Sequence, residues 1–417
     1  MWITRANLVL LIDCVDETTA RSRSLRLDRA ALRFPSSRKD RRADTKQSAD
    51  RVRSVKRRPP FLPFAPRPPQ WRKWVRVLVT GHRGYLGSVL GNVLLRGGFD
   101  VIGADAGWFS GCDFGGPDAL VANAAEDFRD LSPADLASFD AVVHLAGLCD
   151  SASADQGDCL AEAINHRAAL WLAECCRVAG VGRFLLASTC EVYGRTLRPA
   201  SETDPVSPQN AYAGSNAECE RDTLRLASFR YCPVVLRIAS AYGVSPRLRL
   251  DQVVNDHAAA AWLHRRIRLR GSGTARRPLL HVEDIARTIA AMLLAPAGTI
   301  RGQVFNVVDE QACVTELEIA AAVAEVSPEI SWSCGFDEYD PPNLVASSEK
   351  LRRTFRRLSF SWTLTRGVRQ LHAAMDRYGL TPGDWRSDRY RRALRLRTLC
   401  ERGGLNDQLH RPSAAVA

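Results

Sequence analysis

From residue 75 onward, short apolar runs alternate with longer stretches in which apolar residues recur every three to four positions. The short runs predict strands buried on both faces, and the longer stretches predict amphipathic helices. The expected strands span 75–80, 101–105, 141–146, 183–188, 233–238 and 304–308, and the expected helices span 85–96, 159–179, 211–228 and 284–294. Buried strands separated by helices form a doubly wound parallel sheet, which places the chain in the α/β class.

The same pattern divides the chain into four parts. Residues 1–74 lack apolar periodicity and are rich in Arg, Ser and Pro, so we expect a disordered or extended leader. Residues 75–243 hold the first five expected strands. Residues 244–387 form a smaller α/β region whose segment 284–308 returns to the main sheet, and residues 388–417 form an Arg-rich helical tail.

The net charge is confined to the leader. The formal charge of +12 comes from 58 Lys and Arg against 46 Asp and Glu, and residues 1–74 hold 19 basic and 7 acidic residues, which is the whole excess (19 − 7 = 12). The remaining residues are neutral overall, so we expect no nucleic-acid partner for them. For the leader itself, a tail that binds RNA or anionic lipid and a reading frame that starts too early are open alternatives.

The cysteines predict a reducing compartment. Twelve cysteines occur without a Cys-x-x-Cys pair or a Cys/His spacing typical of zinc, so no metal site is expected. Cys175, Cys176 and Cys232 fall inside apolar periodic segments, where buried thiols are found. The apolar stretch 8–12 is too short to span a bilayer. We therefore expect a cytoplasmic protein that does not bind membranes.

A glycine-rich turn links the first expected strand to the first expected helix, with the sequence TGHRGYLG at residues 80–87. Its glycines let the backbone turn sharply and approach a pyrophosphate, whose charge the start of the helix attracts. Asp105 ends the next strand, 24 residues after Gly81 (105 − 81), where a carboxylate accepts the ribose hydroxyls of a dinucleotide. No arginine comes directly after Asp105, which favours NAD over NADP, because the carboxylate would repel a 2′-phosphate. A bare tight turn and a solvated loop acid are the alternatives.

In these features the sequence resembles the extended short-chain dehydrogenase/reductase family, which contains NAD-dependent nucleotide-sugar epimerases and dehydratases. The resemblance covers about residues 75–371 and includes an adenine-contacting pair at 127–128, a fourth-strand motif at 143–147 and a supporting asparagine at 165. It implies a Rossmann-type sheet with a smaller C-terminal substrate-binding unit. It also implies NAD as the cofactor, bound by Gly81, Arg83, Gly84, Tyr85, Leu86, Gly87, Asp105, Asp127, Phe128, Leu145, Ala146, Gly147, Asn165 and Tyr212.

The resemblance extends to a catalytic set, with one departure. Thr189 holds the place of the residue that hydrogen-bonds the reacting sugar oxygen, and Tyr212 that of the general acid and base. One helical turn later the family has a lysine, and this chain has Asn216. Without that cation, a phenol with a pKa of about 10 is ionised in about one molecule per thousand at pH 7. We expect weakened or altered proton transfer, and a cofactor-binding protein with little catalysis is the alternative.

Glu191 matches the base of related sugar 4,6-dehydratases. The acid that precedes it in those enzymes, an Asp, is Cys190 in this chain. A thiol with a pKa of about 8.5 is a poor acid for a leaving hydroxyl, so dehydration ranks below epimerisation and ketone reduction. A surface position or a supporting role is the alternative for Glu191.

Substrate recognition is expected from arginines. Ser240 lies in a strand-end motif at 237–243, and Arg277 matches the family's diphosphate-binding arginine. Arg247 and Arg249 add charge near the expected nucleotide cleft, with solvated side chains as the alternative.

Together these residues imply an NAD-dependent epimerase that moves hydride at a carbon, in the first instance C4, of a nucleotide-diphosphate sugar. A keto-sugar reductase is the close alternative, because it would use the same residues. The family resemblance also implies a homodimer through the helices expected at 159–179 and 211–228.

The leader is expected to contribute nothing to the cofactor site, because every residue assigned to that site follows residue 74. A chain that begins at residue 75 should bind NAD as tightly as the full chain in a calorimetric titration. Weaker binding by the shortened chain would show that the leader takes part in the site.

Overall fold

The computed structural model describes residues 75–115, 121–149, 157–335 and 341–411, which belong to the unit from Pro68 to Ala417. The predicted leader, residues 1–74, lies outside the described residues. Within the described part, no helix is long and apolar enough to cross a membrane. The described cysteines are free of disulfides, and Cys175, Cys176 and Cys232 are buried, as their apolar surroundings predict.

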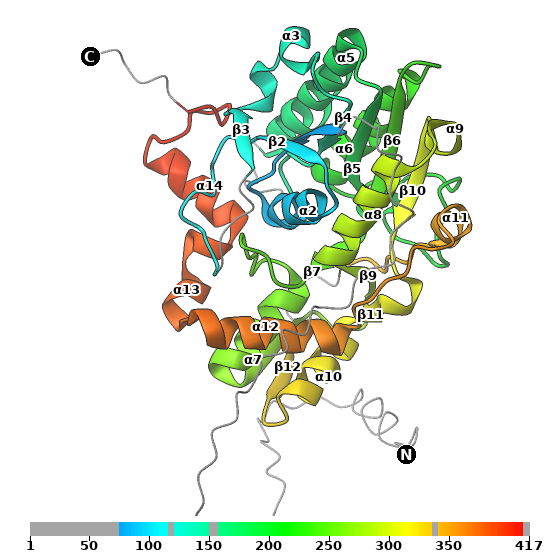
Figure 1. The fold of residues 1–417 in the computed structure, drawn as a ribbon. Helices are drawn as coiled ribbons and strands as arrows, with labels where there is room; N and C mark the ends of the chain where they lie inside the picture. The colour runs from blue at the N-terminus through cyan, green and yellow to red at the C-terminus, as the bar shows by residue number, and fades with distance from the viewer. Residues whose placement is uncertain (1–74, 116–120, 150–156, 336–340, 412–417) are drawn as a thin grey trace, which may run out of the picture. The chain divides into compact units, whose positions relative to one another are not determined.

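A seven-stranded parallel sheet in the order β10-β6-β5-β4-β1-β2-β3 forms the centre of the fold (Figure 1). Its strands are β1 (Arg76–Thr80), β2 (Asp100–Ala104), β3 (Ala122–Ala125), β4 (Ala141–His144), β5 (Arg183–Thr189), β6 (Cys232–Ile238) and β10 (Gln303–Val307). Six of them confirm the strands expected from the apolar runs. The edge strand β3 is additional, because its sequence Ala-Asn-Ala-Ala contains no apolar run of the kind that predicts a strand.

Helices cover both faces of the sheet, which confirms the doubly wound topology (Figure 1). The helices α2 (Tyr85–Arg96) and α8 (Val282–Leu294) pack on one face, and α5 (Ala169–Ala179) and α6 (Ala211–Arg225) pack on the other. Within β1, Val77 and Val79 belong to the core of the first face, and Leu78 between them belongs to the core of the second. Three short helices add to these two cores: α9 (Ala297–Ile300) and α11 (Glu349–Thr354) to that of the first face, and α3 (Pro133–Leu136) to that of the second.

A smaller α/β region has a core of its own. Its strands are β7 (Ser240–Tyr242), β8 (Arg266–Arg270), β9 (Arg276–His281), β11 (Cys313–Thr315) and β12 (Ser331–Gly335), and its helices are α7 (Val253–His264), α10 (Glu316–Val326) and α12 (Leu364–Tyr378). The order β11-β9-β7 forms one small sheet, and β12 pairs with β8. The chain then ends in α13 (Pro382–Arg386), a 3-10 turn at Asp388–Tyr390 and α14 (Arg392–Glu401).

The helix expected at 159–179 is interrupted. It begins as α4 (Gly157–Ala161), widens into a π-helical segment at Glu162–Ala168, and continues as α5. Such segments are rare and occur often at functional sites. This one carries Asn165, the supporting asparagine of the sequence prediction.

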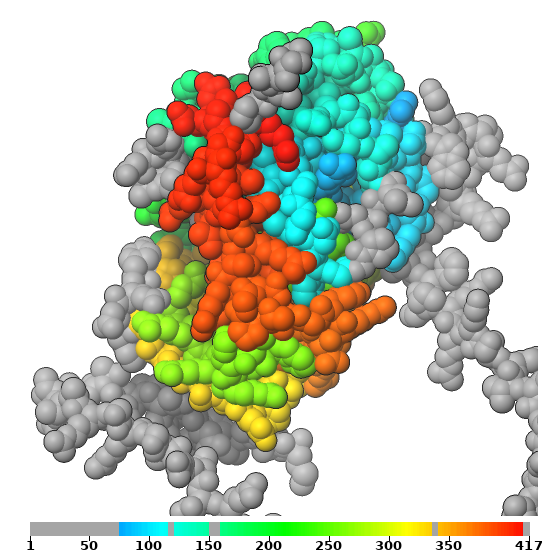
Figure 2. All heavy atoms as spheres, turned by 90° about the vertical axis from the view of Figure 1, so that its left-hand side faces the viewer, coloured from blue at the N-terminus to red at the C-terminus, as the bar shows by residue number. Residues whose placement is uncertain are grey.

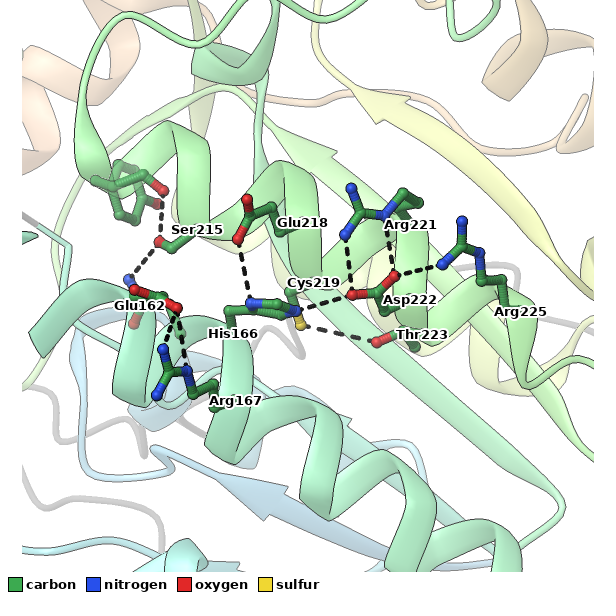
Figure 3. A network of polar contacts seen from close by, with 12 residues as sticks. Glu162, His166, Arg167, Ser215, Glu218, Cys219, Arg221, Asp222, Thr223 and Arg225 are labelled. Carbon is green, nitrogen blue, oxygen red and sulfur yellow. Dashed lines mark hydrogen bonds and ion pairs between the residues drawn. The ribbon is translucent and has the colours of Figure 1, made fainter. Parts of the chain in front are cut away.

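A polar network ties the π-helical segment to α6 (Figure 3). The two ring nitrogens of His166 lie 3.2 Å from Glu218 Oε2 and 3.0 Å from Asp222 Oδ2. Arg221 and Arg225 also contact Asp222, and the hydrogen bond from Arg221 is the main reason that the pKa of Asp222 falls to about 2. The network therefore holds α6 in register against the segment that carries Asn165.

A buried ion pair joins α6 to the central sheet. Glu220 on α6 accepts hydrogen bonds from Nε and Nη2 of Arg237 on β6, at 3.0 and 2.7 Å, and another from the Ser188 hydroxyl on β5. The side chain of Arg237 is 7% exposed and that of Glu220 is 4% exposed. Removing one partner of such a pair leaves the other charge without compensation in a poorly solvated interior.

Replacing Glu220 is therefore expected to be strongly destabilising. The change Glu220→Gln keeps the side-chain volume but strands the Arg237 charge, and we expect it to lower the free energy of unfolding by about 3–5 kcal/mol. Urea denaturation followed by circular dichroism would measure this. Glu218→Gln on the same helix is the matched control, because Glu218 is half exposed and its loss should cost less than about 1 kcal/mol. Equal stability of the two variants would contradict the role given to the buried pair.

Candidate functional site

The carboxyl ends of the central strands surround a cavity of about 290 Å³. Ligands of open α/β sheets bind at this edge, where the connections leave a crevice. The cavity brings together all the residues predicted to bind the cofactor or act in catalysis, except Arg83. Of the two predicted substrate-binding residues, Ser240 lines the cavity and Arg277 does not.

The glycine turn after β1 is built for close approach. Gly81 has a φ of +70°, in the left-handed region, and a Cβ there would lie 2.8 Å from the backbone nitrogen of Ala146. A Cβ on Gly87 would collide with the Gly81 carbonyl. The first turn of α2 carries no acidic residue, and its N-cap Gly84 supplies no side-chain cap. This positive helix end therefore borders the cavity without a side-chain cap or an acidic residue in its own first turn, which suits a pyrophosphate.

Asp105 is held beside the same turn. One carboxylate oxygen accepts the backbone N–H of Arg83 at 2.9 Å, and the other accepts that of Gly107 at 2.8 Å. The side chain of Asp105 lines the cavity, so the alternative of a purely solvated loop acid does not describe it. Arg83 contributes its backbone N–H to Asp105 and does not line the cavity.

The opposite wall is formed by residues after β3 and β4. Asp127 caps the 3-10 turn Phe128–Asp130 and is ion-paired with Arg129 at 2.6 Å. The ring of Phe128 packs edge-on against that of His144, with 4.8 Å between centroids. Burial lowers the pKa of His144 to about 4, so this ring is neutral at physiological pH.

Asn165 positions the loop after β4. Its Oδ1 accepts the N–H of Leu148 at 2.8 Å, and its Nδ2 donates to the Leu148 carbonyl at 3.0 Å. Its Nδ2 also lies 3.4 Å from the Ser215 hydroxyl on α6. A Cβ on Gly147 would lie 2.9 Å from Asn165 Oδ1. The supporting role predicted for Asn165 thus corresponds to a specific set of contacts.

Thr189 and Tyr212 meet inside the cavity. Thr189 ends β5, and its hydroxyl accepts the N–H of Glu191 at 3.1 Å and hydrogen-bonds with Tyr212. Tyr212 lies in the first turn of α6, which begins where the Asn210 side chain caps the N–H of Ala213 at 2.7 Å. A strand end and a helix start therefore bring together two residues that are far apart in sequence.

Asn216 follows Tyr212 by one helical turn and lines the same cavity. Its Nδ2 donates to the backbone carbonyl of Tyr212 at 2.8 Å, so the amide is turned toward its own helix. It supplies no positive charge to the phenol.

Burial raises the pKa of Tyr212 above its ordinary value. The neighbouring Cys149 and Glu191 raise it further, whereas Arg249 and the hydrogen bond with Thr189 lower it. The raising effects prevail, so the phenol is protonated at neutral pH. Since a general base must first lose its proton, the fraction of Tyr212 ready to accept one rises with pH.

The two residues after Thr189 lie in different environments: Cys190 is buried in the core, and Glu191 lines the cavity. Glu191 lines the cavity and is exposed, and Asn210 lies 3.4 Å from its carboxylate. Cys190 is 1% exposed, and its thiol donates to the Arg237 carbonyl at 3.3 Å. Burial is the main reason that the pKa of Cys190 lies well above its usual range. Cys190 is therefore part of the core and takes no part in the cavity wall.

Of the three arginines expected near the ligand phosphates, only Arg249 lines the cavity. Arg277 lies on β9, and its buried Nε has no hydrogen-bond partner among the described residues. Arg249 lines the cavity and is paired with both oxygens of Asp251, at 2.9 and 3.0 Å. Arg247 forms an ion pair with Asp113. Because Arg247 and Arg249 are only 6% and 8% exposed, the solvated alternative for these two side chains is wrong.

Several lining residues were not predicted from the sequence. Trp108 and Phe109 follow Asp105, and Arg392, Ala393 and Leu396 come from α14. The two aromatic residues could have been found from their place directly after the acid of the dinucleotide motif. The α14 residues lie in a segment whose composition predicts only an exposed Arg-rich helix.

Comparison with known proteins finds relatives among nucleotide-sugar epimerases and dehydratases. The sequence matches the NAD dependent epimerase/dehydratase family over residues 77–307. It is 28% identical over 305 residues to the UDP-glucose 4-epimerase of Corynebacterium glutamicum. The aligned residues cover 67% of this chain and 89% of that protein. It is 29% identical over 277 residues to the dTDP-glucose 4,6-dehydratase of Streptomyces niveus, covering 63% and 78%.

Among solved structures, the fold is similar to that of TunA, an NAD-dependent NDP-hexosamine 5,6-dehydratase involved in tunicamycin biosynthesis. The TM-score is 0.64 at 22% identity, and the match covers 72% of this chain and 98% of TunA. At this identity the similarity establishes the fold alone.

Proposed function

The chain belongs to the NAD-dependent epimerase/dehydratase family, and on that premise we propose that it is an epimerase that moves hydride at C4 of a nucleotide-diphosphate sugar. The cavity fits the cofactor. The uncapped start of α2 would hold the pyrophosphate, Asp105 the adenosine ribose, and the wall formed by Phe128 and residues 145–147 the rest of the dinucleotide. When bound, NAD supplies a reversible hydride acceptor.

The chain's own residues supply binding and proton transfer. The Thr189 hydroxyl and the Tyr212 phenol lie together, so both can hydrogen-bond one sugar hydroxyl. Tyr212 would take the proton of that hydroxyl as the carbon is oxidised and return it after reduction on the opposite face. Asn165 keeps the cavity wall in place beside this pair. The unpartnered Nε of Arg277 supports its role as a diphosphate ligand on the substrate side.

The burial of Cys190 is the observation that carries epimerisation over dehydration. A 4,6-dehydratase needs an acid that protonates the leaving hydroxyl, and the position after Thr189 holds a core thiol turned toward the Arg237 carbonyl. Its raised pKa makes it a still weaker acid. Glu191 alone of these two residues lines the cavity, so dehydration would require one carboxylate to carry out the two proton transfers that related dehydratases divide between an Asp and a Glu.

Asn216 favours two alternatives that stay within the same cavity. A keto-sugar reductase would use Thr189 and Tyr212 as a proton donor pair, for which a protonated phenol is the required form. A weakly catalytic NAD-binding protein would follow if the raised pKa of Tyr212 prevents proton abstraction altogether.

Turnover measurements with NAD and a panel of UDP and dTDP sugars test the proposal. For the native chain we expect kcat/KM to rise with pH across the neutral and alkaline range, because Tyr212 must lose its proton and its pKa is raised. Asn216→Lys should move that rise to lower pH, because the ammonium favours the phenolate. Tyr212→Phe should lower turnover about 100-fold or more.

The affinity for NAD serves as the control for both variants, since neither change alters the glycine turn. Tight NAD binding without native turnover, together with activity in Asn216→Lys, would replace the enzymatic proposal with the binding-protein alternative. Formation of 4-keto-6-deoxy sugar would replace it with dehydration.

We also infer a cytoplasmic homodimer whose interface includes α5. Trp171 and Val178 on this helix are 54% and 65% exposed, and the helix belongs to the dimer face that the family resemblance implies. Trp171→Arg is expected to convert the dimer into a monomer in analytical ultracentrifugation. Phe229→Arg is the matched control, because Phe229 is 88% exposed and lies outside α5 and α6. A native chain that sediments as a monomer would contradict the inference.

A further inference from the structure

The residues after α12 lie across one side of the cofactor cavity. We call residues 382–411, which include α13 and α14, the C-terminal segment. Figure 2 shows it, coloured orange to red, lying beside the cyan residues that follow β2. The family match ends at residue 307, so no family motif covers this segment.

The beginning of the C-terminal segment is attached to the loop that carries Arg249. The N–H of Leu250 donates to the Tyr390 carbonyl at 2.8 Å. The N–H of Arg392 donates to Asp251 Oδ2 at 3.2 Å, and its Nη2 donates to the Arg247 carbonyl at 3.0 Å. The side chain of Asp251 therefore connects this loop directly to the start of α14.

The end of the segment is attached to the adenosine side of the cavity. Arg129, whose partner Asp127 is an expected adenine contact, donates to the Leu409 carbonyl at 3.1 Å. Arg411 donates to the carbonyls of Ala106 and Gly107, directly after Asp105, at 3.1 and 3.0 Å. Three leucines anchor the stretch between, each 5% to 7% exposed in the core of the second sheet face: Leu396, Leu405 and Leu409.

Arg392 is the polar residue that this segment adds to the cavity wall. It is 6% exposed, and its guanidinium lies 3.8 Å from the centroid of the Phe109 ring. Its Nη1 is buried and has no hydrogen-bond partner among the described residues. The carboxylate of Asp251 accepts hydrogen bonds from the guanidinium of Arg249 and from the backbone N–H of Arg392. Its contact with Arg392 is therefore made by the backbone and not by the guanidinium.

A buried guanidinium with an unsatisfied N–H is costly unless a ligand pairs with it. Burial and the nearby Arg249 lower the pKa of Arg392 to about 10, which still leaves it charged at neutral pH. Arg249 and Arg392 thus line this part of the wall, and the carboxylate of Asp251 pairs with the guanidinium of Arg249, so the excess charge is positive. An anion in the cavity would complete the hydrogen bonding and balance the charge.

We propose that Arg392 binds a phosphate group of the ligand in this cavity, so that the C-terminal segment is part of the ligand site. The phosphate can come from the dinucleotide or from the nucleotide sugar, which share this chemistry. The inference concerns binding alone and does not depend on whether the chain catalyses epimerisation.

Calorimetric titration of the full chain tests this with three probes: NAD, UDP and phosphate-free adenosine. Arg392→Gln is expected to weaken the binding of NAD, UDP or both by about 10-fold or more and to leave adenosine unaffected. The probe that weakens identifies the source of the phosphate. Arg392→Lys should recover part of the affinity, because it keeps the charge without the planar fork.

Arg397→Gln is the matched control, because Arg397 lies on the exposed side of the same helix and should bind all probes as the native chain does. A second pair guards against misfolding of the Arg392 variants. Ala393 also lines the cavity, and Ala393→Asp should repel a phosphate while Ala393→Asn, of equal size, should not.

Native affinities for NAD and UDP in Arg392→Gln or in Ala393→Asp would overturn the proposal. So would an equal loss for adenosine, because that would indicate a collapsed wall rather than a lost phosphate contact. A native chain that binds neither NAD nor UDP would overturn the proposed function as well, which keeps the two failures distinct.

Discussion

The ion pair between Glu220 and Arg237 is the constraint on which the geometry of the site depends. It fixes α6 against β5 and β6, and the two residues that must meet, Thr189 and Tyr212, lie at the end of β5 and the start of α6. The Arg237 guanidinium also lies over the Tyr193 ring, 4.7 Å from its centroid. Strong interaction in a poorly solvated interior thus positions the two residues to which we assign catalysis, which have few direct contacts of their own.

Positive charge in this cavity lies at its edges rather than beside the phenol. At the position where the family resemblance leads us to expect a lysine, Asn216 binds its own helix, and burial is the largest influence on the pKa of Tyr212. Arg249 and Arg392 provide cations on the wall formed by the loop and the C-terminal segment. This arrangement favours tight binding of phosphorylated ligands over rapid proton abstraction.

The periodic elements and the glycine turn could be predicted from the sequence, because each depends on residues close together in the chain. The apolar runs at β1, β4 and β5 and the exact limits of α2 follow from local patterns. The edge strand β3 and the π-helical segment could not, since neither has a distinctive local composition. The position of the C-terminal segment could not be predicted either, because its contacts join residues as far apart as Arg129 and Leu409, 280 positions along the chain.

That long separation has a consequence for the order in which the molecule is made. The turn directly after the first described strand lines the cavity, and the C-terminal segment, which follows every other described element, supplies one wall. During synthesis the sheet can form while this wall is still within the ribosome, and contacts of such high sequence separation form late in folding. The proposed ligand site is therefore completed only after the C-terminal segment has packed against the sheet.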